Sequence, residues 1–365
     1  MSQRGIPGRT AVAGESVGAC LPVVPAAHGE PPLRAVLRAR PEDFQVEELL
    51  GFDADGEGDH VLLRVEKRGA NTRWVAGQLA AAAGVAVREV GYSGLKDRHA
   101  ATVQHFTVPA ARGAPIADWL DRGGEGYRVL GASRHRRKLR PGSHRANRFR
   151  ILLRDPRGDF ESFEARLVQV ARLGVPNYFG PQRFGRNCAN LERARRWAES
   201  RGAPRRRGER AFALTAARSW LFNRLLAERV WRGDWSVILA GEAVVLEGSR
   251  SFFQASSDDP MLQARCERMD LHPSGPLWGR GELQSADEAR ALELHVLEDE
   301  QPLRRLLESE GLEQERRSLR LPVMGLGCTA EGEGLRLDFE LTRGAFATAV
   351  LHEFVLGAWD ADGSG

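Results

Sequence analysis

The sequence predicts an α+β fold built from two structural units. Alternating apolar and polar residues, which are typical of half-buried strands, occur in short runs such as 44–48 and 102–108. From about Gly174 to Arg320 the pattern changes to longer amphipathic helices, and a strand-like alternation returns at 335–342. With 365 residues and an apolar fraction of 42%, the chain can form two units that each have a core. We therefore expect a strand-rich unit that is interrupted by a helix-rich one.

The first elements are strands. Residues 1–32 are rich in Gly, Pro and Ala without periodicity, and we expect a flexible leader there. Pro41 precedes a strand at 44–48, and an acidic turn leads to a second strand at 61–67. Because the two strands follow one another across a turn, we expect them to form a hairpin.

A helix and two further strands follow. Asn71 or Thr72 is a suitable N-cap for the helix, and Gly84 supplies its C-terminal stop. The β-branched run 85–90 predicts a short buried strand, and 102–108 predicts a half-buried one. The turn between these two strands is thus expected to have a rigid base.

The remaining elements include one strand with two distinct faces. At 147–154 the side chains of Asn147, Phe149, Ile151 and Leu153 share one face, and arginines occupy the other. The other expected elements are helices at 211–229 and 287–297, a strand at 335–342, a helix at 346–354 and a flexible tail at 360–365.

The composition favours a cytoplasmic protein. No stretch reaches the length of a membrane span, and the N-terminus lacks a charged and then apolar export signal. The cysteines Cys20, Cys188, Cys266 and Cys328 are scattered, which argues against a disulfide framework and against a zinc site. We therefore expect neither a metal nor a membrane partner.

Positive charge is concentrated in one stretch, 134–150. The net charge is only +4, but this stretch holds hardly any acidic residue. Such clustering indicates a phosphate backbone as the partner, with a solvated surface as the alternative. The cations are Arg134, Arg136, Arg137, Lys138, Arg140, Arg145, Arg148 and Arg150.

The turn at 91–100 has the sequence Gly-Tyr-Ser-Gly-Leu-Lys-Asp-Arg-His-Ala. It presents one carboxylate, that of Asp97, between Lys96 and Arg98. Two neighbouring cations favour the ionised form of an aspartate, so Asp97 would be available as a nucleophile rather than as a proton donor. A surface turn with a solvated charge cluster is the alternative.

Several other reaction classes lack their motifs. The glycines of the turn are spaced one residue too closely for a nucleophile elbow, and His352-Glu353 lacks the second histidine of a helical zinc motif. No Gly-Lys-Ser/Thr sequence of a phosphate-binding loop occurs. The sequence therefore indicates neither a serine hydrolase, nor a metalloprotease, nor a nucleoside-triphosphate site.

Six sequence blocks occur in a fixed order, and together they resemble one family. The blocks are PEDFQVEE at 41–48, GLKDRHAATVQ at 94–104, KLRPG at 138–142, NRF at 147–149, NYFGPQRFG at 177–185 and GAFAT at 344–348. They resemble the TruD family of tRNA pseudouridine synthases, and the resemblance extends from about Leu33 to Leu356.

The resemblance implies a fold and a reaction. The fold is a pseudouridine synthase catalytic domain with a mixed, largely antiparallel, circularly permuted sheet, here residues 33–173 and 321–359, and an α/β insertion domain, here 174–320. The reaction is the isomerisation of a uridine, at position 13 of tRNA, to pseudouridine. It breaks the N1–C1′ bond and rejoins the uracil through C5, so no cofactor is expected.

The resemblance also implies roles for individual residues. Asp97 matches the catalytic aspartate, which would attack C1′ of the ribose or remove its 2′ proton, and the sequence leaves both routes open. Arg38 would hold this carboxylate ionised and oriented, and the alternative is an ordinary arginine at a strand edge. The substrate-binding residues implied are Arg38, Phe44, Lys96, Asn147, Phe149 and Phe346.

Three of these residues are aromatic. Phe149 and Phe346 would pack on the uracil ring, and Phe44 would line the same pocket. For each of them, packing in the core is the alternative. Asn147 carries both a donor and an acceptor, which suits the polar edge of uracil.

The implied partner is tRNA, bound by a monomer without a membrane or a small-molecule cofactor. The target uridine must leave its stack, so the phosphates beside it need cations. Arg183 and Phe184 are expected at the junction of the two domains. A noncatalytic tRNA-binding or tRNA-folding factor is the alternative function, and another RNA is the alternative substrate. The cations expected on the RNA backbone are Arg134, Arg136, Arg137, Lys138, Arg140 and Arg145.

Overall fold

The computed structural model describes residues 24–110, 116–120, 122–199, 202–249, 251–256 and 259–358. The first 23 residues of the expected leader and the whole of the expected tail at 360–365 lie outside these ranges.

A ten-stranded sheet runs through the strand-rich part of the molecule. Its strands are β1 (Leu33–Val36), β2 (Phe44–Leu49), β3 (His60–Lys67), β4 (Gly91–Tyr92), β5 (Ala101–Pro109), β6 (Gly123–Gly124), β7 (Tyr127–His135), β8 (Ala146–Gly158), β15 (Met324–Glu331) and β16 (Gly334–Thr342). The order is β15-β16-β8-β2-β5-β3-β7-β6, with β1 paired to β8 and β4 to β5. Only β2 and β5 are parallel. The expected mixed, largely antiparallel sheet is confirmed.

Strand β8 connects the two ends of the chain within this sheet. Phe149 of β8 lies opposite Val46 of β2 on one side and opposite Phe339 of β16 on the other. Asn147, Phe149, Ile151 and Leu153 are all buried, as the alternation predicts. Because β16 pairs with β8, C-terminal strands complete a sheet that N-terminal strands begin.

The expected hairpin between the strands at 44–48 and 61–67 is wrong. Both strands exist, as β2 and β3, but β5 lies between them and pairs with each. In β5, three consecutive residues from Phe106 to Val108 are buried, so both of its faces are covered there. Such burial suits a central position in a sheet, and β5 therefore separates the two neighbours in sequence.

The expected strand at 85–90 is also wrong. Residues Val87–Glu89 form the short 3-10 helix η2, and only β4 after it joins the sheet. The Glu89 carboxylate accepts a hydrogen bond from the Ala86 N–H (3.0 Å), which closes the turn. Val87 is exposed, so its β-branched side chain has no core to enter.

Three helices cover the sheet: α1 (Thr72–Ala83), α2 (Phe160–Leu173) and α8 (Ala347–Phe354). Helix α1 begins at the cap Asn71, whose side chain accepts from the Trp74 N–H (2.8 Å), and ends at Gly84 in the left-handed region. Both predicted ends are confirmed. Buried residues of α1 pack against β3, β5 and β7, whereas α2 and α8 pack on β8 and β16.

The chain between the strands of this sheet forms a helical lobe with a small sheet of its own. Its helices are α3 (Ala189–Ala198), α4 (Arg207–Arg232), α5 (Pro260–Glu267), α6 (Asp287–Val296) and α7 (Gln301–Ser309). Its sheet has the order β11-β10-β12-β13, formed by β10 (Ala243–Leu246), β11 (Phe252–Gln254), β12 (Leu271–Leu277) and β13 (Glu315–Ser318). The helices expected at 211–229 and 287–297 are confirmed as parts of α4 and α6.

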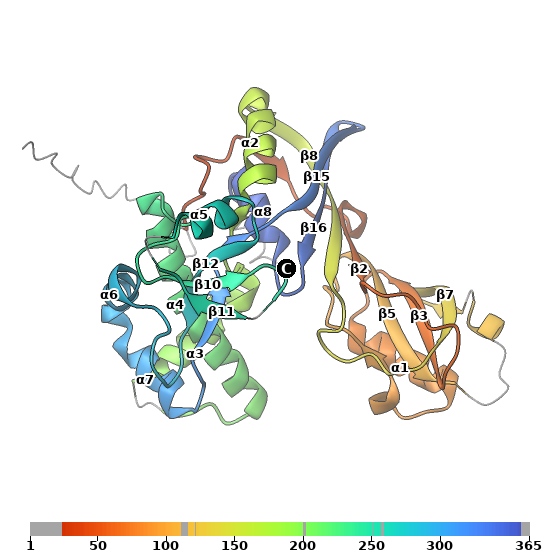
Figure 1. Ribbon diagram of the computed structural model, residues 1–365. Coiled ribbons are helices and arrows are strands. Elements are labelled where there is room, and N and C mark those ends of the chain that lie inside the picture. The colour runs from red at the N-terminus through yellow and green to blue at the C-terminus, as the bar shows by residue number, and fades with distance from the viewer. Residues whose placement is uncertain are drawn as a thin grey trace, which may run out of the picture.

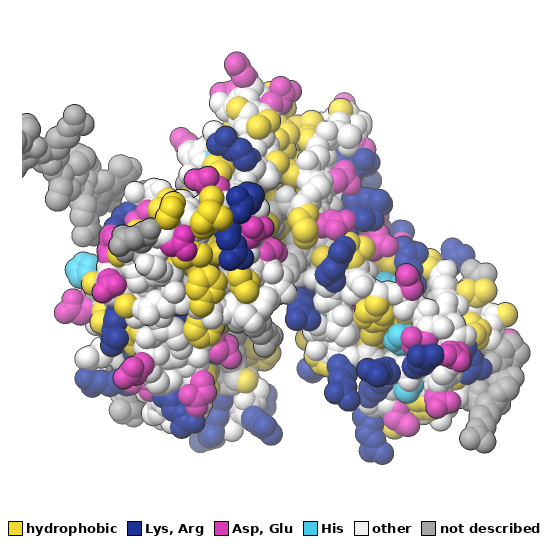
Figure 2. Space-filling view, viewed as in Figure 1, with side chains coloured by type: hydrophobic (Ala, Val, Ile, Leu, Met, Phe, Trp, Pro, Cys, Tyr) yellow, Lys and Arg dark blue, Asp and Glu magenta, His cyan; other side chains and the backbone are white. Residues whose placement is uncertain are grey.

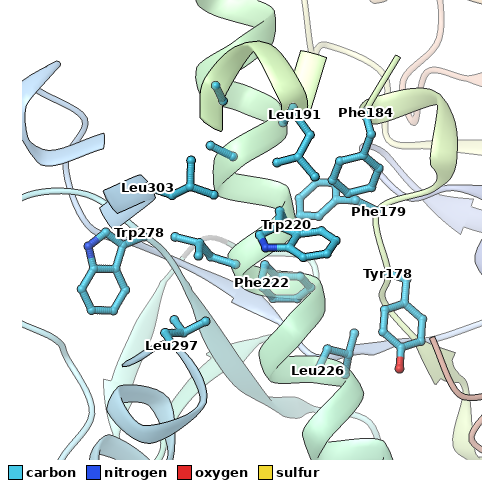
Figure 3. Packing of buried hydrophobic residues seen from close by; sticks show 14 of the residues in the cluster. Tyr178, Phe179, Phe184, Leu191, Trp220, Phe222, Leu226, Trp278, Leu297 and Leu303 are labelled. Atoms are coloured by element: carbon cyan, nitrogen blue, oxygen red, sulfur yellow. The ribbon is translucent and has the colours of Figure 1, made fainter. Parts of the chain in front are cut away.

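Helix α4 is the centre of this lobe. Figure 3 shows Trp220, Phe222 and Leu226 of α4 packed among side chains from several neighbouring segments. Phe184, one of the two residues expected at the junction, is buried in the same cluster. A helix that is buried over much of its circumference needs apolar residues on more than one face, which α4 has.

Two short strands carry the chain between the helical lobe and the large sheet. The chain enters the lobe at β9 (Val175–Pro176) and leaves it at β14 (Arg320–Leu321), and these two short strands pair with each other. Figure 1 shows the helical lobe on one side, the strands around α1 on the other, and β8, β15 and β16 between them. We propose that residues 174–320 form a structural unit of their own, inserted into the unit formed by 33–173 and 321–359.

The N-terminal segment 24–32 is packed onto the protein, so the expectation of a flexible leader up to residue 32 is wrong there. The N–H groups of Ala27 and His28 donate to the carboxylate of Glu353 in α8 (2.8 and 3.1 Å). Arg166 of α2 donates to the backbone carbonyl groups of the same segment. The Gly- and Pro-rich composition gave no sign of these contacts, because they depend on residues far away in the sequence.

Two further features of the chain concern cysteines and helices. Cys266 and Cys328 carry free thiols, but Cys188 takes part in a disulfide, which the scattered spacing of the cysteines did not predict. None of the helices in the described ranges combines the length and the apolar character needed to cross a membrane.

Candidate active site

Asp97 lies in the loop between β4 and β5, which we call the Asp97 turn (residues 93–100). Its side chain is 41% exposed. One carboxylate oxygen accepts from the His99 N–H (2.9 Å), and the other lies 3.8 Å from a guanidinium nitrogen of Arg38. The guanidinium of Arg38 also lies over the ring of Phe44, at 4.1 Å from its centroid. The structure thus brings together three residues that are distant in the sequence.

The backbone of Arg38 has a φ of 56°, in the left-handed region. This conformation is uncommon for a residue other than glycine, and it costs free energy that the surrounding contacts must offset. The guanidinium of Arg38 contacts Asp97 and Phe44, so the strained residue is one that faces the exposed carboxylate.

The two cations that flank Asp97 in the sequence point elsewhere. The ammonium group of Lys96 donates to Asn147 Oδ1 (2.6 Å), and Arg98 Nε donates to the carbonyl oxygen of Gly69 (3.2 Å). The expectation that these neighbours hold the Asp97 carboxylate ionised is therefore not supported by their geometry. Arg38 provides the positive charge beside Asp97.

The backbone of the turn is held from behind by Lys67. This lysine is buried at the end of β3, and its Nζ donates to the carbonyl oxygens of Ala70 (2.9 Å), Lys96 (3.4 Å) and Asp97 (2.8 Å). Burial lowers the pKa of Lys67 to about 8, although the charge of Asp97 acts in the opposite direction. One buried amine therefore fixes the main chain at Asp97.

A second network ties the turn to α1 and β5. The Lys96 N–H donates to Thr72 Oγ1 (3.0 Å), and this hydroxyl in turn donates to Gln104 Oε1 (3.0 Å). The amide nitrogen of Gln104 donates to the carbonyl oxygen of Gly94. Thr72 and Gln104 are fully buried, and buried hydrogen bonds of this kind hold one defined geometry.

Asn147 is positioned by a buried ion pair. Lys96, which donates to its side-chain oxygen, also lies 3.1 Å from the carboxylate of Glu48. Burial alone would raise the pKa of Glu48, but a hydrogen bond to His105 and the nearby charge of Lys96 outweigh it, so the pKa is lowered. With its oxygen engaged, Asn147 can offer its amide N–H groups to a carbonyl oxygen of a ligand.

The predicted aromatic residues divide into two groups. Phe44 and Phe149 meet edge to face, with ring centroids 6.2 Å apart, and Phe149 stacks on Phe339 at 5.3 Å. Phe346 instead meets Phe179 (6.0 Å) and lies beneath the guanidinium of Arg183 (5.4 Å). Phe44 and Phe149 are linked to Asp97 through Arg38, whereas Phe346 contacts the residues that lead into the helical lobe.

The basic stretch follows β7 and continues into β8. Five of its cations are exposed: Arg136, Arg137, Lys138, Arg140 and Arg145. Figure 2 shows Lys and Arg side chains where the lobe that carries α1 faces the helical lobe. Arg136 forms an ion pair with Glu57.

On β8 itself the arginines are paired with acidic residues. Arg148 lies 2.8 Å from the carboxylate of Glu340, and Arg150 lies 3.4 Å from that of Asp338. The arginine-bearing face of β8 is therefore a ladder of ion pairs across β8 and β16, and its charge is largely balanced.

Comparisons with known proteins agree on one family. The family model described as tRNA pseudouridine synthase D (TruD) matches residues 26–192 and 209–354. A tRNA pseudouridine synthase D of Nitrosococcus oceani is 49% identical over 330 residues, which cover 90% of this chain and 92% of that protein. A tRNA pseudouridine synthase D of Xanthomonas euvesicatoria is 46% identical over 348 residues, or 91% and 94% of the two chains. The chain belongs to the TruD family.

A solved structure shows the same fold. The crystal structure of a Methanosarcina mazei protein that was assigned to TruD superposes with a TM-score of 0.71, at 18% identity, over 92% of this chain and 96% of that one. The resemblance that the six sequence blocks indicate is confirmed by the TruD family model, which spans all of them. These similarities do not test the roles of individual residues, which stay predictions.

The sequence did not reveal the buried residues that support the Asp97 turn. Lys67 gave one signal, since it is one of only three lysines and follows an apolar strand. Glu48 and Gln104 end two of the blocks quoted above and Thr72 lies outside all six, but nothing in their spacing shows that they meet at the turn. Their partners are between 10 and 57 residues away in the sequence.

Proposed function

We propose that this protein isomerises uridine to pseudouridine in tRNA, at position 13, and that Asp97 is the carboxylate that acts on the ribose. In this reaction the N1–C1′ bond breaks, the uracil turns, and C5 forms the new bond to C1′, so that the proton on C5 is released. The names of the relatives support the reaction and its tRNA substrate. The position of the uridine and the role of Asp97 are our inference.

The observation that carries this proposal is the geometry of Asp97. An exposed carboxylate on a firmly held turn can approach C1′ or the 2′ proton of a ribose without a rearrangement of its backbone. Arg38 lies beside one of its oxygens, and the His99 N–H donates to the other. Both routes need an oriented carboxylate, and the ion pair with Arg38 and the hydrogen bond from His99 favour one orientation of it.

The groups around Asp97 suit a uracil ring. Asn147 would donate to a uracil carbonyl oxygen, since Lys96 already holds its own side-chain oxygen. Phe44 and Phe149 would form the apolar wall of the pocket, at the end that Arg38 joins to Asp97. Phe346 would meet the base from the side of the helical lobe, where it contacts Phe179. Lys96 acts through Asn147 and is a positioning residue.

The exposed cations would hold the tRNA backbone while the uridine leaves its stack. Arg137, Arg140 and Arg145 are exposed and form no ion pair within 4 Å among the residues that the structure describes, although Asp55 lies close enough to Arg137 to feel its charge. Their charges are therefore available to phosphates. Arg134, Arg136 and Lys138 belong to the same stretch and would add to its field.

Tritium release tests the reaction and its position together. The wild-type protein is incubated with tRNA transcripts that carry tritium at C5 of uridine, because formation of the new C5–C1′ bond releases that hydrogen. We expect release from a tRNA with uridine at position 13 and none from the same tRNA with cytidine there. Release that is unchanged by this substitution would contradict the position. Binding of tRNA without any release would favour the noncatalytic tRNA-binding factor.

A further inference from the structure

A pocket of about 730 Å³ opens beside the Asp97 turn. None of the residues proposed to contact the uridine lines it. It lies between the first turn of α1 and the β6–β7 hairpin, in the lobe that carries α1 in Figure 1. Trp74, Arg98 and Tyr127 are among the residues that line it. Its volume is within the range of pockets that hold small organic ligands.

One wall of the pocket is an exposed aromatic surface. Trp74 is 42% exposed, and its ring meets Tyr127 edge to face at 5.9 Å and 80°. The backbone of Trp74 is fixed by the N-cap of α1, since its N–H donates to Asn71 (2.8 Å). A flat apolar ring that is held in place and still open to solvent is the kind of surface on which nucleic-acid bases stack.

The charges around this wall favour a phosphate. Arg98 is fixed by the Gly69 carbonyl oxygen and has no acidic partner within the described ranges. Glu66 is engaged by Arg68 (3.1 Å). The ionisable lining residues are the cations Lys67, Arg68, Arg98 and Arg128 against the acids Glu66 and Glu125. Because Arg68 is shared between Glu66 and Glu42 and Lys67 donates to backbone carbonyl oxygens, Arg98 is the lining cation best placed for an anionic ligand.

The pocket adjoins the Asp97 turn. Arg98 follows Asp97 directly, and consecutive Cα atoms are only about 3.8 Å apart. Lys67 lines the pocket and also donates to the Asp97 carbonyl oxygen (2.8 Å). A ligand in the pocket therefore lies next to whatever Asp97 attacks, and the same RNA chain can reach both places.

We propose that this pocket, the Trp74 pocket, binds one unstacked nucleotide of the tRNA that lies close in the chain to the target uridine. Its base stacks on Trp74, and its phosphate lies at Arg98. Extrusion of the uridine leaves its neighbour without a stacking partner, and Trp74 replaces that partner. The proposal rests on the proposed function, because that function supplies the RNA.

Substitution of Trp74 tests the stacking surface. The dissociation constant of tRNA is measured by filter binding for wild type, Trp74→Ala and Trp74→Phe, with Trp231→Ala, another exposed tryptophan, as the matched control. We expect Trp74→Ala to weaken binding about five- to hundredfold, which corresponds to the loss of one stacked base. Trp74→Phe should retain most of the affinity and Trp231→Ala all of it. Wild-type affinity in Trp74→Ala would overturn the proposal.

Abasic sites identify the occupant. They are placed one at a time on either side of position 13, and we expect one position at which the wild type loses as much affinity as Trp74→Ala does, with no further loss in the variant. If no position behaves in this way, the pocket does not hold a base, and a protein partner becomes the better candidate. Even if Trp74→Ala fails to fold, Arg98→Gln should weaken tRNA binding. It should also reduce the slope of log affinity against log salt by about one, the contribution of one phosphate contact. These measurements concern binding alone. The proposed pocket can therefore be correct even if no tritium is released, and the proposed reaction can be correct even if the pocket binds no nucleotide.

Discussion

At the scale of single residues, the position of Asp97 depends on groups that are remote in the sequence. Its carboxylate meets Arg38, and its carbonyl oxygen accepts from the buried amine of Lys67. The flanking cations Lys96 and Arg98 are used elsewhere, one on Asn147 and one on a backbone carbonyl. If Asp97 acts on the ribose as proposed, its reactivity depends on how accurately its main chain is held.

Replacement of Lys67 by methionine tests this dependence. The change keeps the length of the side chain but removes the donor to three carbonyl oxygens. We expect Lys67→Met to lower kcat about a hundredfold, since a small misplacement of a reactive group has that effect, while tRNA binding changes only a few-fold. The matched control is Arg172→Met, which removes an exposed cation in the last turn of α2 and should leave kcat unchanged. Equal kcat in Lys67→Met and the wild type would contradict this role.

The pKa of Lys67 predicts how stability changes with pH. A lysine in the unfolded chain keeps its proton up to about pH 10.5, whereas burial lowers the pKa of folded Lys67 to about 8. Between these values the unfolded state binds more protons than the folded state, so the free energy of unfolding rises with pH. Urea unfolding at pH 7.5 and 9.5 should show this rise in the wild type and a smaller one in Lys67→Met. The same rise in both proteins would show that another group causes it.

At the scale of elements, the basic stretch and β8 differ in how their arginines are used. Arg137, Arg140 and Arg145 are exposed without an acidic partner in the described part of the chain, whereas Arg148 and Arg150 are paired across the sheet. A cation that contacts a phosphate displaces counterions condensed on the RNA. An arginine that already has a carboxylate partner contributes less to this release.

The salt dependence of tRNA binding distinguishes the two sets. The triple variant with Ala at 137, 140 and 145 should reduce the slope of log affinity against log salt by about 2 to 3. The control with Ala at 148 and 150 should change that slope much less, because its arginines already have carboxylate partners. Equal slopes in the triple variant and the wild type would show that these arginines are a solvated surface that contacts no phosphate.

The elements that the sequence predicts well are those with local signals. Helix α1 has its cap at Asn71 and its stop at Gly84, and the buried face of β8 follows from alternation alone. Strand pairing is not local, and so the insertion of β5 between β2 and β3 could not be predicted from the turn that joins them. The same holds for the site, because motif residues identify Asp97 but give no sign that Lys67 and Gln104 hold it.

At the scale of the whole molecule, one sheet brings the two ends of the chain together around the candidate site. Strand β8 pairs with β2 on one side, near Asp97 and Phe44, and with β16 on the other, just before Phe346. The chain passes between this sheet and the helical lobe at the paired strands β9 and β14, and Phe346 at the start of α8 packs against Phe179 beside them. This arrangement allows residues from both lobes to approach one extruded base, which is what the proposed reaction needs.

The most direct test of this account compares Asp97→Asn with the wild type in the tritium-release assay. Asparagine keeps the shape of the side chain and an oxygen for the His99 N–H, but it removes the negative charge that would act on the ribose. We predict that Asp97→Asn releases no tritium above background while its affinity for tRNA stays within a few-fold of the wild type. Turnover by Asp97→Asn at a rate near that of the wild type would contradict the account.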